Sequence, residues 1–120
     1  MHACIDEPSP ESRVDPLCFL VRGWIAPTAG FEAGGAKGGR GVNLRMVDNC
    51  VYGNDGNGLW SDVQSRGTLL DGNVVFNNTY QGIFYEISTT GTISNNIVGH
   101  NGQRWPWMWG GQITLGTSDH

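Results

Sequence analysis

The sequence predicts an all-β fold in which the chain winds as a parallel coil of about three turns. Gly occupies 19 of 120 positions and only 15% of residues are charged, which favours tight turns over long helices. Val, Ile and Thr are frequent, and no segment has an apolar stripe with the helical period. A pair of asparagines also recurs at a nearly constant interval in the low twenties, which is typical of solenoids.

The asparagine pair defines the repeat. It occurs in three segments, which span residues 48–63, 72–87 and 95–115. The first asparagine of each pair is Asn49, Asn73 or Asn96, and the second always follows five residues later. We expect the asparagine side chains to form hydrogen-bonded ladders along the coil. We also expect the backbone of these residues to adopt the left-handed conformation of a sharp corner.

Three short strand-like runs surround each pair. LRMV, TLLD and GTIS precede the first asparagine, CVY, VVF and NIV follow it, and LWSDV, IFYEI and ITL complete the pattern. Three strands per turn indicate a triangular parallel coil.

GLWSD, GIFYEIS, the repeated GN-V-N spacing and the later W-W-GGQI resemble the right-handed parallel β-helix proteins of the pectin-lyase-like superfamily, over about residues 35–120. The resemblance implies a right-handed parallel β-helix, and the repeat gives its coils a length of about 23–24 residues. The resemblance also implies a polysaccharide partner and an extracellular or cell-surface location, although the N-terminus shows no signal peptide.

The repeats occupy residues 37–120, and residues 1–36 do not repeat. Pro8, Pro10 and Pro16 in this first part predict one or two β segments with turns that cap the lower end of the helix. The run Gly30–Gly41 reads as a linker. We expect Cys4, Cys18 and Cys50 to be free, buried thiols, with a Cys4–Cys18 disulfide as the alternative. The chain stops directly after a strand, so we expect a truncated fragment.

Alternation along the strands separates inward from outward side chains. The residues predicted to point inward are Leu59, Ser61, Val63, Ile83, Tyr85 and Ile87. Trp60 and Asp62 then point outward, and in the repeat register they stack against Phe84 and Glu86. Neighbouring strands lie about 4.8 Å apart, so the two carboxylates repel and at least one pKa should be raised.

Stacked aromatics beside paired carboxylates suit a sugar site. Trp60 and Phe84 would cover the apolar face of a pyranose, and Asp62 and Glu86 would act as acid and base. Two alternatives stay open: aromatic stacking alone, and Ca²⁺ between the carboxylates, although no cofactor is otherwise expected.

No Lys or Arg is seen stacked on this strand, which favours a hydrolase over a lyase. The third coil has no carboxylate at the matching position, near Gly116, which favours binding over catalysis.

The insertion in the third repeat is rich in tryptophan. Arg104, Trp105, Trp107 and Trp109 lie on a loop between strands, where they form either the wall of a sugar-binding cleft or a hydrophobic cap over the end of the solenoid. In the first case Arg104 would pair with an acidic sugar.

Composition excludes two other partners. The net charge of -4 disfavours nucleic acid, and no apolar run is long enough to span a membrane. The sequence therefore predicts a carbohydrate-binding or carbohydrate-active β-helix, as a fragment of an extracellular hydrolase or lyase. The alternative is a non-catalytic structural or adhesive solenoid, of the surface-protein or phage tail-fibre type, that forms homo-oligomers through its open ends.

Overall fold

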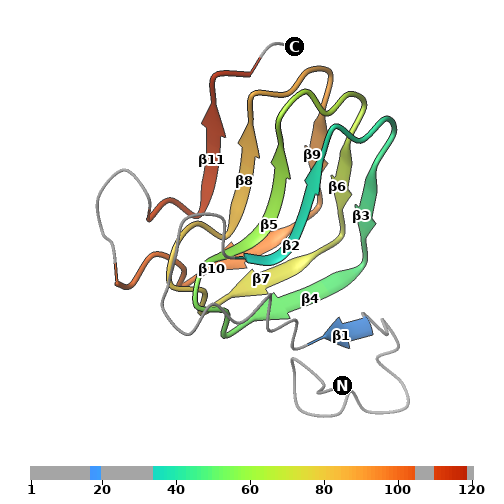
Figure 1. The fold of residues 1–120 in the computed structure, drawn as a ribbon. Helices are drawn as coiled ribbons and strands as arrows, with labels where there is room; N and C mark the ends of the chain where they lie inside the picture. The colour runs from blue at the N-terminus through green and yellow to red at the C-terminus, as the bar shows by residue number, and fades with distance from the viewer. Residues whose placement is uncertain (1–16, 20–33, 105–109, 119–120) are drawn as a thin grey trace.

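The computed structural model describes the backbone of residues 17–19, together with residues 34–104 and 110–118. Every regular element assigned in this part of the chain is a β-strand (Figure 1). They are β1 (Leu17–Phe19), β2 (Gly34–Gly39), β3 (Arg45–Val47), β4 (Asn49–Tyr52), β5 (Asn57–Asp62), β6 (Leu69–Asp71), β7 (Val74–Phe76), β8 (Ile83–Glu86), β9 (Thr92–Ser94), β10 (Ile97–Gly99) and β11 (Ile113–Gly116). These residues include no helix that is long and apolar enough to cross a membrane.

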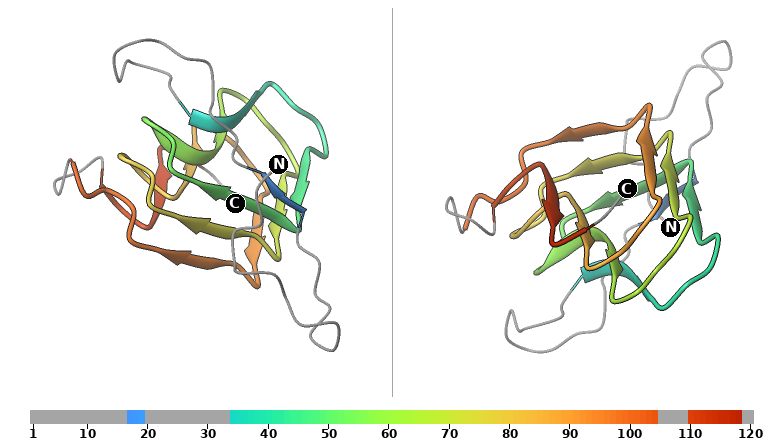
Figure 2. Two further views of the ribbon diagram at one scale, coloured as in Figure 1. Left: turned by 90° about the horizontal axis from the view of Figure 1, so that it is seen from below. Right: turned by 90° about the horizontal axis from the view of Figure 1, so that it is seen from above.

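The strands form three parallel sheets around one interior. Sheet A has the order β1-β4-β7-β10, sheet B the order β2-β5-β8-β11, and sheet C the order β3-β6-β9. Figure 2 shows β4, β7 and β10 of sheet A side by side in this order. Leu69 pairs with Arg45 one coil below and with Thr92 one coil above, so the coils advance by the same steps as the asparagine repeat. The predicted right-handed parallel β-helix, with coils of the predicted length, is confirmed.

Columns of aliphatic side chains fill the interior. Val51 and Val75 stack on sheet A, and Met46 and Leu70 stack on sheet C, all of them buried. Each fully buried aliphatic side chain contributes about 1.5–3 kcal/mol of burial free energy. A register slip of one residue would turn these columns outward, so the interior fixes the stacking of the coils.

One asparagine ladder runs along the corner from sheet C to sheet A. The side-chain amide of Asn49 donates to Oδ1 of Asn73 at 3.0 Å, and that of Asn73 donates to Oδ1 of Asn96 at 2.9 Å. The backbone N–H of the lower residue donates to the same oxygen in both steps. The predicted ladder is confirmed.

The second ladder runs through Asn54, Asn78 and Asn101, with amide-to-oxygen distances of 2.8 Å at both steps. Above it, Oε1 of Gln112 accepts from the side-chain amide of Asn101 at 3.0 Å. Gln112 thus takes the place of a fourth asparagine and caps this ladder.

The left-handed corner lies one residue before the first ladder. Asp48, Gly72 and Asn95 have positive φ angles of 55°, 66° and 53°, whereas the ladder asparagines do not. The prediction that the ladder asparagines adopt this conformation is therefore wrong. The preceding residue makes the turn, so that the asparagine keeps its N–H and its side chain aligned for the ladder.

The glycine-rich run differs from the expected linker. Gly34–Gly39 form β2, the first strand of sheet B, paired in parallel with β5. A Cβ at Gly35 would lie only 2.6 Å from Cγ1 of Val51, so the interior has no room for a side chain there. The predicted cap falls mostly outside the described residues.

Cys50 is disulfide-bonded, so the expectation of three free thiols is wrong. In sheet A the backbone of Cys18 pairs in register with that of Cys50. Cys4, and with it the alternative Cys4–Cys18 pairing, lies outside the described residues.

Candidate functional site

The outward side of sheet B carries the predicted aromatic pair. Leu59 on β5 and Ile83 on β8 belong to the core, and the next residue of each strand, Trp60 and Phe84, points to the opposite side. The two rings stack with centroids 5.4 Å apart and planes 25° from parallel. The predicted stacking is confirmed.

These outward side chains are nevertheless buried. Trp60 is 5% exposed, Phe84 is 3% exposed and Asp62 is 5% exposed. An openly solvated face is therefore the wrong description for all three. Ile87, predicted to point inward, is instead 46% exposed, because the strand has ended and its φ is 45°.

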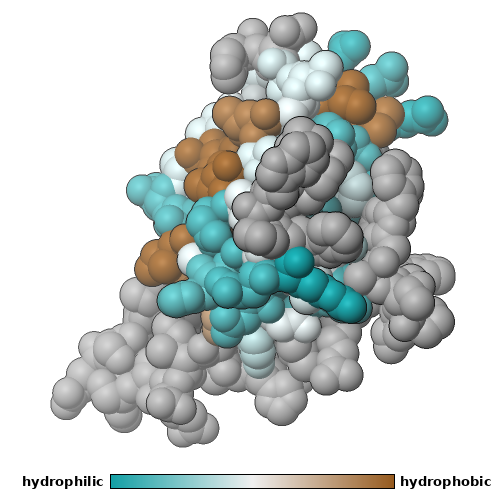
Figure 3. All heavy atoms as spheres, turned by 90° about the vertical axis from the view of Figure 1, so that its left-hand side faces the viewer, coloured by the Kyte–Doolittle hydropathy of each residue, from teal (hydrophilic) through white to brown (hydrophobic). Residues whose placement is uncertain are grey.

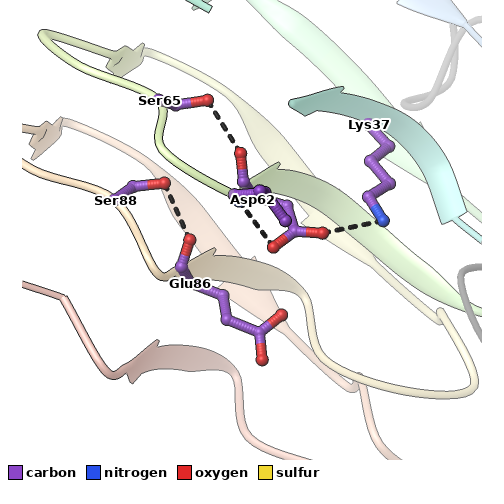
Figure 4. Close-up of polar contacts among 6 residues, drawn as sticks. Lys37, Asp62, Ser65, Glu86 and Ser88 are labelled. Atoms are coloured by element: carbon purple, nitrogen blue, oxygen red, sulfur yellow. Dashed lines mark hydrogen bonds and ion pairs between the residues drawn. The ribbon is translucent and has the colours of Figure 1, made fainter. Parts of the chain in front are cut away.

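Lys37 is the functional candidate that the sequence prediction missed. It lies on β2 in register with Trp60, and its ammonium is 3.8 Å from the centroid of the Trp60 ring. The same ammonium forms an ion pair of 2.8 Å with Oδ2 of Asp62 (Figure 4). Lys37 precedes Trp60 by one coil length in the sequence, and this spacing is the signal that could have revealed it.

A column of serines holds the ends of the strands of sheet B. Ser65 Oγ donates to the carbonyl of Asp62 at 2.9 Å, and Ser88 Oγ donates to that of Glu86 at 2.7 Å (Figure 4). Ser118 Oγ donates in the same way to a carbonyl of the third coil. The sequence prediction missed this column, although Ser65 and Ser88 are one coil length apart.

Two contacts hold the carboxylate of Asp62. Its Oδ1 accepts the backbone N–H of Val63 at 2.6 Å, while its Oδ2 accepts the ammonium of Lys37. These two contacts fix the orientation of the carboxyl group.

Glu86 lies on the neighbouring strand and is half-buried. Burial raises the pKa of its carboxyl, and the negative charge of Asp62 raises it further. Lys37 and the nearby indole N–H of Trp60 lower this pKa by less, and the indole forms no hydrogen bond of ordinary geometry with the carboxylate. The predicted raised pKa of one carboxyl is confirmed for Glu86.

Two buried donors, one on β5 and one before β8, have no hydrogen-bond partner among the described residues. They are Nε1 of Trp60 and Nε2 of Gln81, which precedes β8. Leaving such a donor unpaired costs about 1–3 kcal/mol, so a hydrogen bond from either donor to an acceptor would lower the free energy.

The third coil ends the polar cluster. Thr114 pairs in register with Phe84, and Gly116 pairs with Glu86. Thus β11 adds no third carboxylate, as predicted from the position of Gly116. What remains is a protonatable carboxyl beside an ion-paired carboxylate, which is the combination that acid–base chemistry requires.

The structure does not bring Arg104 to this cluster. Nη1 of Arg104 lies 3.2 Å from Oδ1 of Asp55, which precedes β5, whereas Asp62 ends that strand. At about 3.3 Å per residue, the chain between the two acids spans up to about 23 Å, most of it along β5. Trp105, Trp107 and Trp109 lie outside the described residues.

Metal ligands are few. Among residues 34–104 and 110–118, no three His, Cys, Asp or Glu side chains gather closely enough to hold a metal ion. Ca²⁺ takes six to eight oxygen ligands, and here one of two carboxylates already pairs with an ammonium. These residues fit Ca²⁺ poorly.

Comparison with known proteins gives a family. Searches of curated proteins and of solved structures found no match. A family described as "Right handed beta helix region" matches residues 26–119, most of the chain. Together with the three parallel sheets and the stacked coils, this match shows that the chain belongs to the right-handed β-helix family.

Proposed function

We propose that this chain is a carbohydrate-binding β-helix of the pectin-lyase-like superfamily whose sugar site lies on the outward side of sheet B. The observation that carries the proposal is the half-buried carboxyl of Glu86, which lies beside the Lys37–Asp62 ion pair and the stacked rings of Trp60 and Phe84. The charged groups supply partners for the hydroxyls of a pyranose, and the buried, stacked rings fix the strands that carry these groups.

A ligand can reach the site through its partly exposed side chains. Glu86 is half-buried, and the Lys37 side chain is 25% exposed, so these two groups meet a ligand first.

The same groups support hydrolysis better than they support a lyase reaction. Burial and the negative charge of Asp62 raise the pKa of Glu86, which suits the acid of such a pair, and the ion-paired carboxylate of Asp62 lies beside it. The strands that carry these two carboxyls lie about 4.8 Å apart, a spacing compatible with the carboxyl separation of about 5–5.5 Å in retaining glycosidases. Lys37, the candidate base for a lyase, is held in an ion pair with Asp62.

We propose an extracellular or cell-surface location and a polysaccharide partner. The disulfide at Cys50 supports this location, because disulfides persist in oxidising compartments.

Tryptophan fluorescence tests the proposed site. The intact chain is titrated with neutral and acidic oligosaccharides, beside the double variant Asp62→Asn/Glu86→Gln. We expect a saturable change that the double variant weakens at least tenfold. Asp71→Asn is the control, since it also removes a carboxylate but on sheet C. If no sugar changes the fluorescence, or if the double variant responds as the unaltered chain does, sheet B is not the site. If a sugar binds, that sugar is then assayed for hydrolysis.

A second candidate function is a structural or adhesive solenoid. The open end formed by the third coil exposes Ile113 and Leu115, the latter at 58%. A cavity of about 310 Å³ opens there, lined by Tyr85, Gly91, Ile93, Leu115, Thr117 and Ser118. Figure 3 shows apolar surface on the side where β11 lies.

Association through this end predicts a molecular mass that rises with concentration in sedimentation equilibrium, and Leu115→Asp should hold the protein monomeric. A constant monomeric mass for the unaltered chain would argue against the adhesive role. Edge strands that pair with another chain are the physical basis of the prediction.

A further inference from the structure

A second pair of stacked rings lies on sheet A. Tyr52 ends β4 and Phe76 ends β7, and their centroids are 5.0 Å apart with planes only 6° from parallel. The preceding residues, Val51 and Val75, belong to the core, so the two rings point outward from the solenoid. Unlike the rings on sheet B, both are only half-buried.

The third coil leaves the upper face of this stack open. Gly99 pairs in register with Phe76, so it holds the position where a third ring would lie. A Cβ built at Gly99 meets no atom within 4 Å. Coils repeat about every 4.8 Å, close to the spacing between the two rings, so one further flat ring fits on Phe76 at the level of Gly99.

Polar side chains lie just beyond the rings, at the corner between sheets A and B. Oδ1 of Asp55 accepts the hydroxyl of Thr79 at 3.1 Å and the guanidinium of Arg104 at 3.2 Å. Asp55 and Thr79 each follow a stacked ring by three residues, which is about 10 Å of chain at most. The corner therefore supplies a carboxylate, a hydroxyl and a guanidinium within the length of two sugar units.

We propose that the open face of Phe76, at the level of Gly99, is a stacking subsite for a neutral pyranose. A pyranose has one apolar face for the ring and a rim of hydroxyls for the corner. The Asp55–Arg104 pair leaves these two groups with no net charge, which favours a neutral sugar over an anionic one. This site is separate from sheet B and does not rest on the function proposed for it.

The test uses cellohexaose and N-acetylchitohexaose, with sorbitol as a control that has hydroxyls but no ring. Heteronuclear NMR of the labelled intact chain follows the backbone N–H of Gly99 and the ring protons of Phe76. We expect saturable shifts at both residues with at least one hexasaccharide and none with sorbitol.

Two variants separate binding from folding. Phe76→Ala should weaken binding about tenfold, which corresponds to the loss of one ring contact. Gly99→Phe should weaken binding equally by filling the subsite, while its melting temperature stays at or above that of the unaltered chain. Tight binding by Gly99→Phe would overturn the proposal even if Phe76→Ala failed to fold.

The other possible results of the NMR titration also support or reject the subsite. Shifts confined to the indole N–H of Trp60 would place sugar on sheet B alone and overturn this subsite without touching the other proposal. Shifts at Gly99 that persist in Asp62→Asn/Glu86→Gln would support it independently. No shift at Gly99 with either hexasaccharide, or concentration-dependent shifts there without sugar, would reject the subsite, the latter in favour of contact between two copies of the chain.

Discussion

The outward sides of sheets A and B carry the same structural device, one aromatic ring stacked on another in the next coil, in opposite surroundings. On sheet B the ring of Phe84 is almost fully buried, Thr114 follows it in the third coil, and Lys37 lies against its partner ring. On sheet A the ring of Phe76 is half-buried, and Gly99 leaves its upper face open. An aromatic ladder therefore does not reveal its own role. The residue that follows it and the charges beside it decide whether the rings mainly stabilise the fold or also present a free face.

The largest expected effect separates the two stacks by their contribution to stability. Phe84→Ala should lower the free energy of unfolding by about 3–5 kcal/mol, the usual cost of emptying a buried aromatic site. Phe76→Ala should cost only about 1 kcal/mol, since much of its ring already meets water. Urea unfolding of both variants gives the comparison. Equal losses would mean that the sheet A rings are packing elements like those on sheet B.

The next effect tests the charges that distinguish sheet B. Lys37→Met should destabilise the protein by about 2 kcal/mol, because it leaves the buried carboxylate of Asp62 without its counter-ion. The double variant Lys37→Met/Asp62→Asn is the matched control and should recover most of that loss, since the amide keeps the oxygen that accepts the N–H of Val63. A single variant as stable as the unaltered chain would show that the ion pair contributes nothing measurable.

The asparagine repeat and the strand-like runs around it were enough to predict a parallel coil and the stacking of Trp60 on Phe84, because register in a solenoid places every residue beside its counterpart one coil on. The right-handed form came from the family resemblance. The same spacing of one coil also places Lys37 beside Trp60. The glycines around Lys37 resembled a linker, so the strand that carries it was not predicted. Burial of Asp62 could not be predicted, because alternation distinguishes only two faces of a strand and says nothing of what covers the outer one. The contact of Arg104 with Asp55 depends on the path of an insertion that has no repeat to follow.

A smaller effect concerns pH. Since burial and Asp62 raise the pKa of Glu86 above its ordinary 4.5, the stability that its carboxyl contributes is complete below that value and is lost as pH rises through the folded-state pKa. Glu86→Gln should remove this loss and so be more stable than the unaltered chain near pH 7, by up to about 1 kcal/mol for a partly screened carboxyl.

Unfolding by urea at pH 4 and pH 7 measures the difference, and Asp71 supplies the opposite case. The hydroxyl of Ser94 and the amide of Asn95 lower the pKa of Asp71, so its contribution is present above about 3.8 and is lost as pH falls. Asp71→Asn should therefore be less stable than the unaltered chain at both pH values, and the difference should close only as the pH falls below about 3.8. A Glu86→Gln profile parallel to that of the unaltered chain would contradict the raised pKa.

The smallest effect compares the two glycines that end the outward columns. A Cβ at Gly99 meets open space, and its φ is not positive, so Gly99→Ala should stabilise the protein by about 0.5 kcal/mol by restricting the unfolded chain. At Gly116 a Cβ would lie 3.2 Å from Cε2 of Phe84, so Gly116→Ala gains the same entropy but crowds a buried ring and should be neutral or destabilising. Thermal unfolding of the two variants checks the order. If Gly116→Ala proved the more stable, the ring of Phe84 would have room to move, and the contrast between a closed column on sheet B and an open one on sheet A would fail.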